Sequence, residues 1–149
     1  MRLILVRHAQ QTPGDFSFSA ELTDQGRLDL AKTISHLDQK NTSPDVVYTS
    51  PLKRAVESAE MIASHFSASL LVEEALGDYF DPNVLIQILQ EAQEKTVCFV
   101  GHAPSLPDFA RRLCPEASSI SRGCALVLDV TITDTEIEGM YNTLVTPEG

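Results

Sequence analysis

Residues 3–10 read Leu-Ile-Leu-Val-Arg-His-Ala-Gln, an aliphatic run that ends abruptly in a cation and a histidine. Consecutive aliphatic residues are typical of a short strand buried on both faces, as in a parallel sheet. Such sheets place binding and catalysis at the carboxyl ends of their strands. We therefore expect Arg7 and His8 at the rim of a sheet, facing a crevice. The guanidinium should also favour the neutral, nucleophilic form of the imidazole.

A second segment has the same design. The β-branched and aromatic run over residues 96–100 stops at Gly101 and His102, and Pro104 suits the first turn of a following helix. Gly101 would let the backbone turn sharply or approach a ligand closely. Two buried strands thus each end in a histidine, which predicts a site that contains both.

A third element lies in residues 46–55, which read Val-Val-Tyr-Thr-Ser-Pro-Leu-Lys-Arg-Ala. The strand runs into Ser50, a favourable N-cap, followed by Pro51 at the first helical position. Arg54 then falls in the first helical turn, where a cation opposes the helix dipole. An anion bound jointly by Arg54 and the free amides would resolve this conflict, so the sequence predicts an anion site here.

Composition limits the classes of function. The chain has 149 residues, 43% of them hydrophobic, which suits a single domain with a substantial core. A formal net charge of −10 argues against nucleic acid or an anionic membrane as partner, so an anionic substrate needs a local group of cations. No apolar stretch approaches the length of a membrane span, and the N-terminus lacks signal-peptide features, so we expect a cytoplasmic enzyme.

The sequence offers no metal or disulfide motif. The cysteines, Cys98, Cys114 and Cys124, are odd in number and widely spaced, so we expect small core residues and a helix-end residue. The carboxylates do not gather beside the histidines at metal-ligand spacing. We therefore expect neither a metal ion nor another cofactor.

Strand and helix alternate along the chain, which indicates a mostly parallel sheet covered on both faces. Helices are expected from residue 23 to about 40, from 51 to about 66 and from 103 to about 113. A further helix, capped by Asp81 or Asp78, should hold Val84, Leu85, Ile88 and Leu89. Thr23 is the expected cap of the first helix, whose buried face should carry Leu28, Ala31, Ile34 and Leu37. Residues 70–72 should form a third strand, and residues 125–130 and 136–144 a closing hairpin.

The polar loop over residues 11–21 carries two aromatic residues, Phe16 and Phe18. Aromatic side chains in such a loop usually anchor it to the core, which is our expectation here. A position on a rim that faces the substrate is the alternative.

Four motifs together resemble the histidine phosphatase superfamily, also called the phosphoglycerate mutase-like family. They are Arg7-His8, Leu22-Thr23-Asp24-Gln25-Gly26, Ser50-Pro51-Leu52-Lys53-Arg54-Ala55 and Gly101-His102. In length and in the short connection between Glu73 and Val84, the chain is most similar to the small phosphohistidine phosphatases of the SixA type, which lack the inserted cap domains of the mutases. One departure is Ala9, where the family usually has glycine.

The resemblance implies a three-layer α/β/α sandwich with a mostly parallel central sheet, formed by residues 1–149 as one domain without a cap. It implies that His8 is the nucleophile and that Arg7, Arg54 and His102 hold the phosphoryl oxygens, for which forked guanidinium donors are suited. An acidic residue after the third strand would protonate the leaving group. Glu74 is the first candidate for that role, with Glu73, Asp78 and Asp81 as alternatives.

The implied activity is that of a cofactor-free phosphatase that forms a phosphohistidine at His8 and hydrolyses it with water. The expected substrate is a phosphohistidine of a signalling protein. Two alternatives stay open: a small-molecule phosphomonoesterase of the same family, and a non-catalytic phosphate-binding scaffold on the same fold. A mutase is disfavoured, because it must shield its phosphoenzyme from water and this chain has few residues for a lid.

Overall fold

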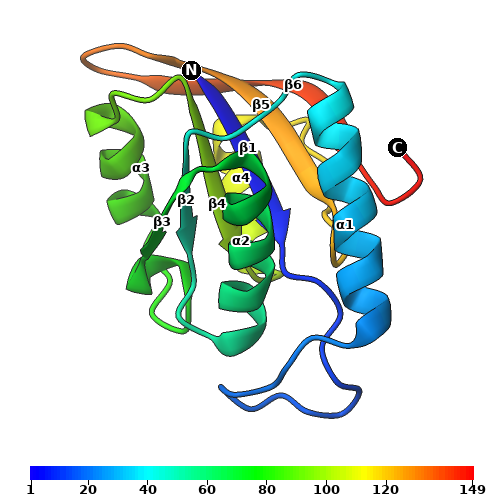
Figure 1. The fold of residues 1–149 in the computed structure, drawn as a ribbon. Helices are drawn as coiled ribbons and strands as arrows, with labels where there is room; N and C mark the ends of the chain where they lie inside the picture. Colours follow the sequence, from blue (N-terminus) through cyan, green and yellow to red (C-terminus); the bar gives the residue numbers. More distant parts are fainter.

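The computed structural model describes residues 1–149 and contains one six-stranded sheet with the order β3-β2-β4-β1-β5-β6 (Figure 1). The strands are β1 (Arg2–Arg7), β2 (Val46–Thr49), β3 (Ser69–Val72), β4 (Thr96–Gly101), β5 (Ala125–Ile132) and β6 (Ile137–Val145). The helices are α1 (Asp24–Gln39), α2 (Lys53–Phe66), α3 (Pro82–Glu91) and α4 (Ser105–Leu113), with a short 3₁₀ helix η1 (Glu74–Leu76) after β3.

Strand β1 lies inside the sheet, between β4 and β5. The strands β3, β2, β4 and β1 are parallel, and β5 and β6 add an antiparallel hairpin, which confirms the expected mostly parallel sheet. Because β5 runs antiparallel to β1, its first residue, Ala125, pairs with Val6 near the end of β1. The segment that precedes β5 therefore lies at the edge where the parallel strands end.

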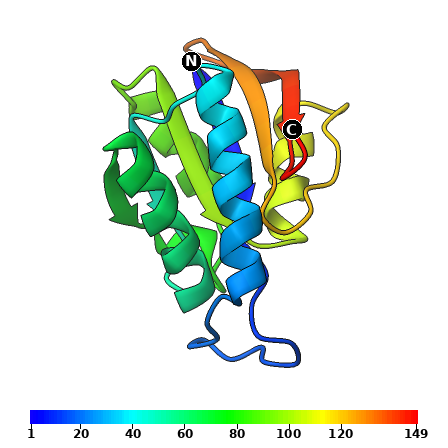
Figure 2. The same ribbon diagram turned by 45° about the vertical axis from the view of Figure 1, so that its right-hand side comes forward.

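Helices cover both faces of the sheet and form the expected three layers, which Figures 1 and 2 show from two directions. Ile4 and Val6 pack into the apolar cluster under α1 and α2. Leu3 and Leu5 pack into the cluster on the other face, with Phe99 and residues of α3 and α4. A strand with cores on both sides requires a continuous aliphatic run, and residues 3–6 supply it.

The N-terminus of α1 confirms the predicted cap. The N–H of Gly26 donates to the Thr23 hydroxyl at 2.9 Å. A Cβ atom at Gly26 would lie 2.5 Å from the carbonyl oxygen of Gln10, so this first turn packs tightly against the loop after β1. Of the four residues predicted on the buried face of α1, Ile34 and Leu37 are buried. The prediction is wrong for Leu28, which is 59% exposed, and for Ala31, and Leu30 is buried instead.

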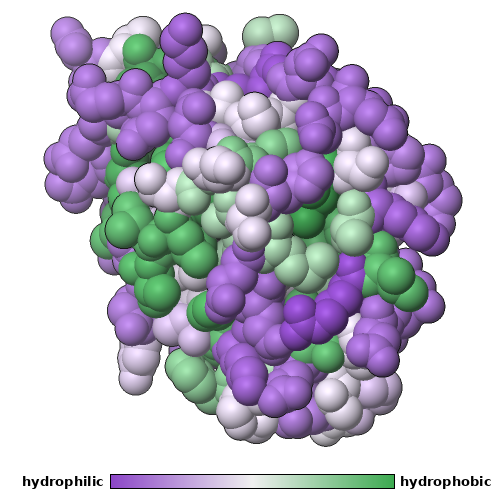
Figure 3. All heavy atoms as spheres, viewed as in Figure 1, coloured by the Kyte–Doolittle hydropathy of each residue, from purple (hydrophilic) through white to green (hydrophobic).

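The surface of the protein is mostly hydrophilic on the face that Figure 3 shows. On the face shown, apolar side chains gather over the edge strand β3, where Leu71 and Val72 are 49% and 60% exposed. All three cysteines are buried and unpaired, as expected. No helix combines the length and the apolar character needed to cross a membrane.

Candidate active site

A pocket of about 380 Å³ lies at the edge where the parallel strands end. Four of the five predicted site residues line it: Arg7, His8, Arg54 and His102. They come from the ends of β1 and β4 and from the first turn of α2. The parallel order of these strands therefore brings together residues that are nearly a hundred positions apart in the sequence.

His8 is buried, and its hydrogen bond fixes the tautomer of the ring. The Nδ1 atom lies 2.7 Å from the carbonyl oxygen of Ala9. Because a carbonyl can only accept, Nδ1 carries the proton and Nε2 keeps its lone pair. This is the form that a nucleophilic histidine needs. The rings of His8 and His102 are adjacent, with centroids 5.0 Å apart.

Both histidines are neutral at neutral pH. Burial lowers the pKa of His8 to about 3. The hydrogen bond to Ala9 opposes this lowering, and His102, Arg54 and Arg7 add smaller contributions to it. Burial also lowers the pKa of His102 to about 4, helped by Arg54 and opposed by Asp78. The sequence correctly indicated a neutral His8, but removal from water contributes more than the neighbouring guanidinium.

Ala9 fits the position where glycine was expected from the family pattern. It is fully buried in the apolar cluster under α1 and α2. Its N–H donates to the Ser58 hydroxyl at 3.0 Å. Its φ angle is not positive, since only Asn41 and Ser67 have positive φ among the non-glycine residues. Alanine is therefore accommodated without backbone strain.

Three arginines surround the histidines, and none of them pairs with a carboxylate. Arg7 donates to the carbonyl oxygen of Ile120 at 3.3 Å, and Arg54 to that of Ser17 at 3.0 Å. Burial lowers the pKa of both guanidinium groups. The charge of Arg122 adds to the lowering, and for Arg54 the carboxylates of Asp78 and Asp15 oppose it. The pocket thus gathers three arginines without ion-pair partners in an acidic protein, and Asp78 is the carboxylate among its lining residues.

The pocket also holds most of the unsatisfied polar atoms of the protein. Four buried side-chain atoms have no hydrogen-bond partner: Nε of Arg7, Nε of Arg54, Oε1 of Gln11 and Oγ of Ser118. The first three belong to pocket residues. Buried polar atoms without partners are unfavourable and rare. Their concentration here indicates a site in which a ligand supplies the missing partners.

Ser50 has a different role from the predicted one. Helix α2 begins at Lys53, and no side chain caps its N-terminus. The buried Ser50 hydroxyl instead lies 2.7 Å from Nε2 of His102 and accepts a hydrogen bond from the N–H of Leu52. The prediction of Ser50 as N-cap is therefore wrong, because this hydroxyl orients His102. Arg54 still falls in the first turn of α2, as expected.

Among the acidic candidates, Asp78 lines the pocket and Glu74 does not. Glu74 begins η1 and is exposed. Glu73 accepts from the N–H of Ala75, and Asp81 caps α3, so both are engaged elsewhere. The structure thus places Asp78, rather than the preferred candidate Glu74, among the residues that line the pocket.

The reason lies in the glycine that precedes Asp78. A Cβ atom at Gly77 would lie 2.9 Å from Cδ of Pro51 and 3.3 Å from the Ser50 hydroxyl. Only glycine allows the chain to approach the β2–α2 turn this closely. The approach brings the next residue, Asp78, against the site, while Glu74 stays on the solvent side of the turn.

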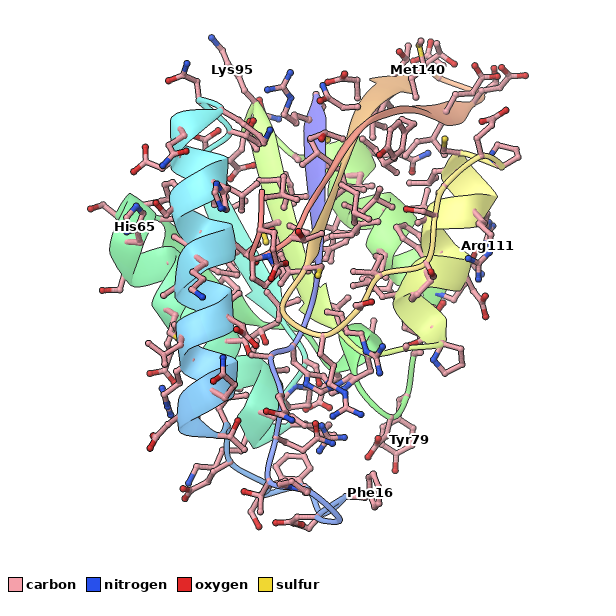
Figure 4. All side chains as sticks on the ribbon, turned by 90° about the vertical axis from the view of Figure 1, so that its right-hand side faces the viewer. Phe16, His65, Tyr79, Lys95, Arg111 and Met140 are labelled. Carbon is pink, nitrogen blue, oxygen red and sulfur yellow. The ribbon has the colours of Figure 1, made fainter.

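Sequence reasoning missed Arg122 and Gln11 and misjudged Phe16. Arg122 lies three residues before β5, at the end of the sheet where the site is, which the antiparallel direction of β5 could have indicated. Phe16 lines the pocket and is 78% exposed, so the expectation that it anchors the loop to the core is wrong. Figure 4 shows Phe16 and Tyr79 extending from the same end of the molecule.

No group of three or more histidine, cysteine, aspartate or glutamate side chains is arranged to hold a metal ion. The polar groups of the pocket are instead mostly donors that suit an anion. The arrangement can bind a tetrahedral oxyanion and place it against the free Nε2 of His8.

The fold is similar to that of several solved phosphatases. Protein histidine phosphatase SixA, complexed with tungstate, gives a TM-score of 0.85 at 20% identity over 99% of this chain and 97% of that chain. A mycobacterial glucosyl-3-phosphoglycerate phosphatase gives 0.74 at 14% identity over 95% and 96%. The alpha-ribazole phosphatase of Shigella flexneri gives 0.72 at 20% identity over 95% of both chains.

No curated protein matches the sequence significantly. The family model of the histidine phosphatase superfamily (branch 1) matches residues 3–80, which is more than half of the chain. This range contains the His8 segment, the α1 cap and the turn that carries Arg54. The protein therefore belongs to the histidine phosphatase superfamily.

Proposed function

We propose that this protein is a phosphatase that transfers a phosphoryl group to Nε2 of His8 and then hydrolyses the phosphohistidine with water. The main support is the pocket itself, which combines a neutral His8 of fixed tautomer with three arginines that lack carboxylate partners. Phosphoryl transfer depends on an in-line nucleophile and on positive donors around the equatorial oxygens.

The first step uses residues from three segments. Nε2 of His8 attacks phosphorus, and the bond to the leaving group breaks as its electron pair goes to the leaving atom. Arg7 and Arg54 hold the phosphoryl oxygens with forked donors. Asp78 gives a proton to the leaving group. Ser50 keeps the ring of His102 beside the nucleophile through the 2.7 Å contact.

The substrate we propose is a phosphohistidine on a protein. The pocket volume of about 380 Å³ fits one phosphorylated side chain. Beside it, Phe18 and Tyr79 are 57% and 82% exposed. The carbonyl of Phe18 accepts from Lys53 at the start of α2, and Tyr79 follows Asp78, so both flank the pocket. Exposed aromatic residues around a site suit contact with a protein surface.

A phosphohistidine also suits the proton donor. An imidazole leaves more easily than an alkoxide, so the reaction tolerates an acid as exposed as Asp78. The similar fold of protein histidine phosphatase SixA, solved with the tetrahedral oxyanion tungstate, supports the same substrate class. A small phosphate monoester is the second candidate, because a glucosyl-3-phosphoglycerate phosphatase has a similar fold and fold does not determine substrate.

The test is phosphate release in the presence of a chelator from a phosphohistidine-bearing phosphotransfer domain, for the wild type and for His8→Ala. The proposal predicts release by the wild type and loss of at least about a thousandfold in the variant. Release only from p-nitrophenyl phosphate would favour the small-molecule phosphatase. Phosphate binding without turnover of either compound would indicate the scaffold and contradict the proposal.

The protein substrate has its own test. The double variant Phe18→Ser/Tyr79→Ser should raise KM for the phosphotransfer domain by about tenfold and leave p-nitrophenyl phosphate turnover unchanged. Met140→Ser is the matched control, because Met140 is 72% exposed and lies at the opposite end of the molecule (Figure 4). Equal KM values for the wild type, the double variant and Met140→Ser would contradict docking of the substrate protein on these aromatic residues.

A further inference from the structure

Gln11 lies in the pocket, but the phosphoryl-transfer step described above gives it no role. It comes three residues after His8 and is 6% exposed. An antiparallel bridge to Leu22 holds its backbone. The residues on either side are fixed as well, because the carbonyl of Gln10 accepts from Thr23 and the N–H of Thr12 donates to Glu21, both at 3.0 Å. The position of Gln11 is therefore set by the start of α1.

The side chain of Gln11 lacks a hydrogen-bond partner of a specific kind. Its Oε1 atom is buried and has no hydrogen-bond partner. An amide oxygen can only accept, so its partner must be a donor. The other unsatisfied atoms of the pocket, Nε of Arg7 and Nε of Arg54, are donors. Phosphoryl oxygens can satisfy those two nitrogens, but they cannot satisfy Oε1.

Hydrolysis of a phosphohistidine brings one strong donor into this pocket, which is the attacking water. We infer that Gln11 is a catalytic residue whose Oε1 accepts a hydrogen bond from that water and orients it toward phosphorus. The inference rests on the proposed covalent route through His8. A glutamine amide suits the role, because it orients water without gaining or losing a proton.

The hydrolytic step then balances as follows. The water oxygen bonds to phosphorus on the side opposite His8, and the P–Nε2 bond breaks with its electron pair returning to Nε2. One water proton leaves with the phosphate as hydrogen phosphate, and the other restores the proton that Asp78 gave to the leaving group in the first step. Nδ1 of His8 keeps the proton that it donates to Ala9, so the ring returns to its starting tautomer.

The experiment separates the two half-reactions. Phosphoramidate serves as the phosphoryl donor, and samples are quenched in alkaline denaturant at short times to follow phosphoenzyme formation and decay. Gln11→Leu removes the amide and keeps apolar bulk. We expect its dephosphorylation rate to fall roughly 10- to 100-fold, while phosphorylation changes less than about threefold. Phosphoenzyme should therefore accumulate at steady state.

Two further variants sharpen the result. Gln11→Glu keeps an acceptor at this position, so its phosphoenzyme should decay faster than that of Gln11→Leu. Ser118→Ala is the matched control, because Ser118 carries the one unsatisfied buried atom outside the pocket. Its two rates should equal those of the wild type. A normal phosphorylation rate in Gln11→Leu also shows that this variant is folded.

Three results would overturn the assignment of Gln11: equal slowing of both steps, slowing of phosphorylation alone, or no change in either. The first would indicate a phosphoryl contact or a structural role, and the second a contact with the leaving group. If the wild type itself forms no phosphoenzyme, the proposed function fails instead. The two failures are thus distinguishable.

Discussion

Two hollows, at opposite ends of the strands of the sheet, differ in whether their charged groups have partners within the protein. The larger, of about 670 Å³, includes Arg2, Lys95 and Asp129, and the smaller, of about 380 Å³, contains His8. Figure 4 shows the two ends, with Lys95 and Met140 at one and Phe16 and Tyr79 at the other.

In the larger hollow, Arg2 and the N-terminal ammonium have partners within the protein. Arg2 pairs with Asp129 at 3.3 Å, and the terminal ammonium donates to the carbonyl of Val130 at 3.2 Å. In the smaller hollow no arginine meets a carboxylate, and three residues keep buried polar atoms without partners. Size therefore does not identify the site. Arginines without ion pairs and buried polar atoms without hydrogen bonds do, because a ligand can supply the missing partners.

The largest expected effect is the difference in kcat/KM between a substitution of Arg54 in the smaller hollow and one of Arg2 in the larger hollow. Arg54→Ala should lower kcat/KM by about a thousandfold, because one donor aimed at developing charge contributes that much. Arg54→Lys should remain strongly impaired, since lysine cannot reproduce the fork. Arg2→Ala is the control and should stay within about twofold of the wild type. Steady-state kinetics check this prediction. Similar losses of kcat/KM in Arg54→Ala and Arg2→Ala would contradict the difference between the two hollows.

The acidic residues give the next largest effect. Asp78→Asn should slow hydrolysis of a phenyl phosphate by about a hundredfold and that of a phosphohistidine by less, because the imidazole leaves more easily. Glu74→Gln, four positions earlier in the same segment, should behave like the wild type. Parallel measurement of kcat on both substrates checks the assignment. A larger loss in Glu74→Gln would restore the preference that the sequence suggested.

Two glycines test how the site is built. Gly77→Ala should lower the free energy of unfolding by about 1–3 kcal/mol and kcat by about tenfold, since its Cβ would displace the turn that carries Asp78. At Gly101 a Cβ would lie 3.5 Å from the carbonyl of Leu76, an ordinary contact. Gly101→Ala should therefore fold normally, contrary to the role expected from the sequence. Urea denaturation checks both, and equal stabilities would refute the close approach at Gly77.

The last prediction concerns the dependence of stability on pH. The pKa values of His8 and His102 are lowered to about 3 and about 4 from 6.5, so below about pH 6.5 the unfolded chain binds more protons than the folded protein. This contribution to stability is complete above pH 6.5 and is lost as the pH falls toward 4. Tm should decrease over that range.

Nuclear magnetic resonance gives the direct reading of the same prediction. The ring signals of His8 and His102, assigned with His8→Gln and His102→Gln, should remain those of neutral imidazole down to about pH 5. Titration of either ring with a midpoint between about 6 and 7 would contradict the burial that sets both pKa values.

Much of the architecture was accessible from the sequence because it depends on local patterns. The aliphatic run before Arg7, the Thr23 cap and the Gly101-His102 strand end each reflect short-range rules, and parallel strands then bring the two histidines together. These features require only that the strands end at the same edge.

The features that sequence reasoning missed depend on contacts between distant segments. Ser50 matches an N-cap pattern, but its hydroxyl contacts His102, which is 52 residues away. The choice of Asp78 over Glu74 depends on the packing of Gly77 against Pro51. Arg122 enters the site because β5 runs antiparallel to β1. Sequence spacing carries no information on which of these contacts form.

The most direct measurement of the central claim is phosphorus NMR of the protein after phosphoramidate treatment in chelator, with peptide mass spectrometry after alkaline quench. The account predicts one phosphoryl group on His8, attached at Nε2 because Nδ1 is bonded to the carbonyl of Ala9, and none in His8→Ala. A phosphoryl group on His102, attachment at Nδ1, or phosphate release without any labelled His8 would contradict it.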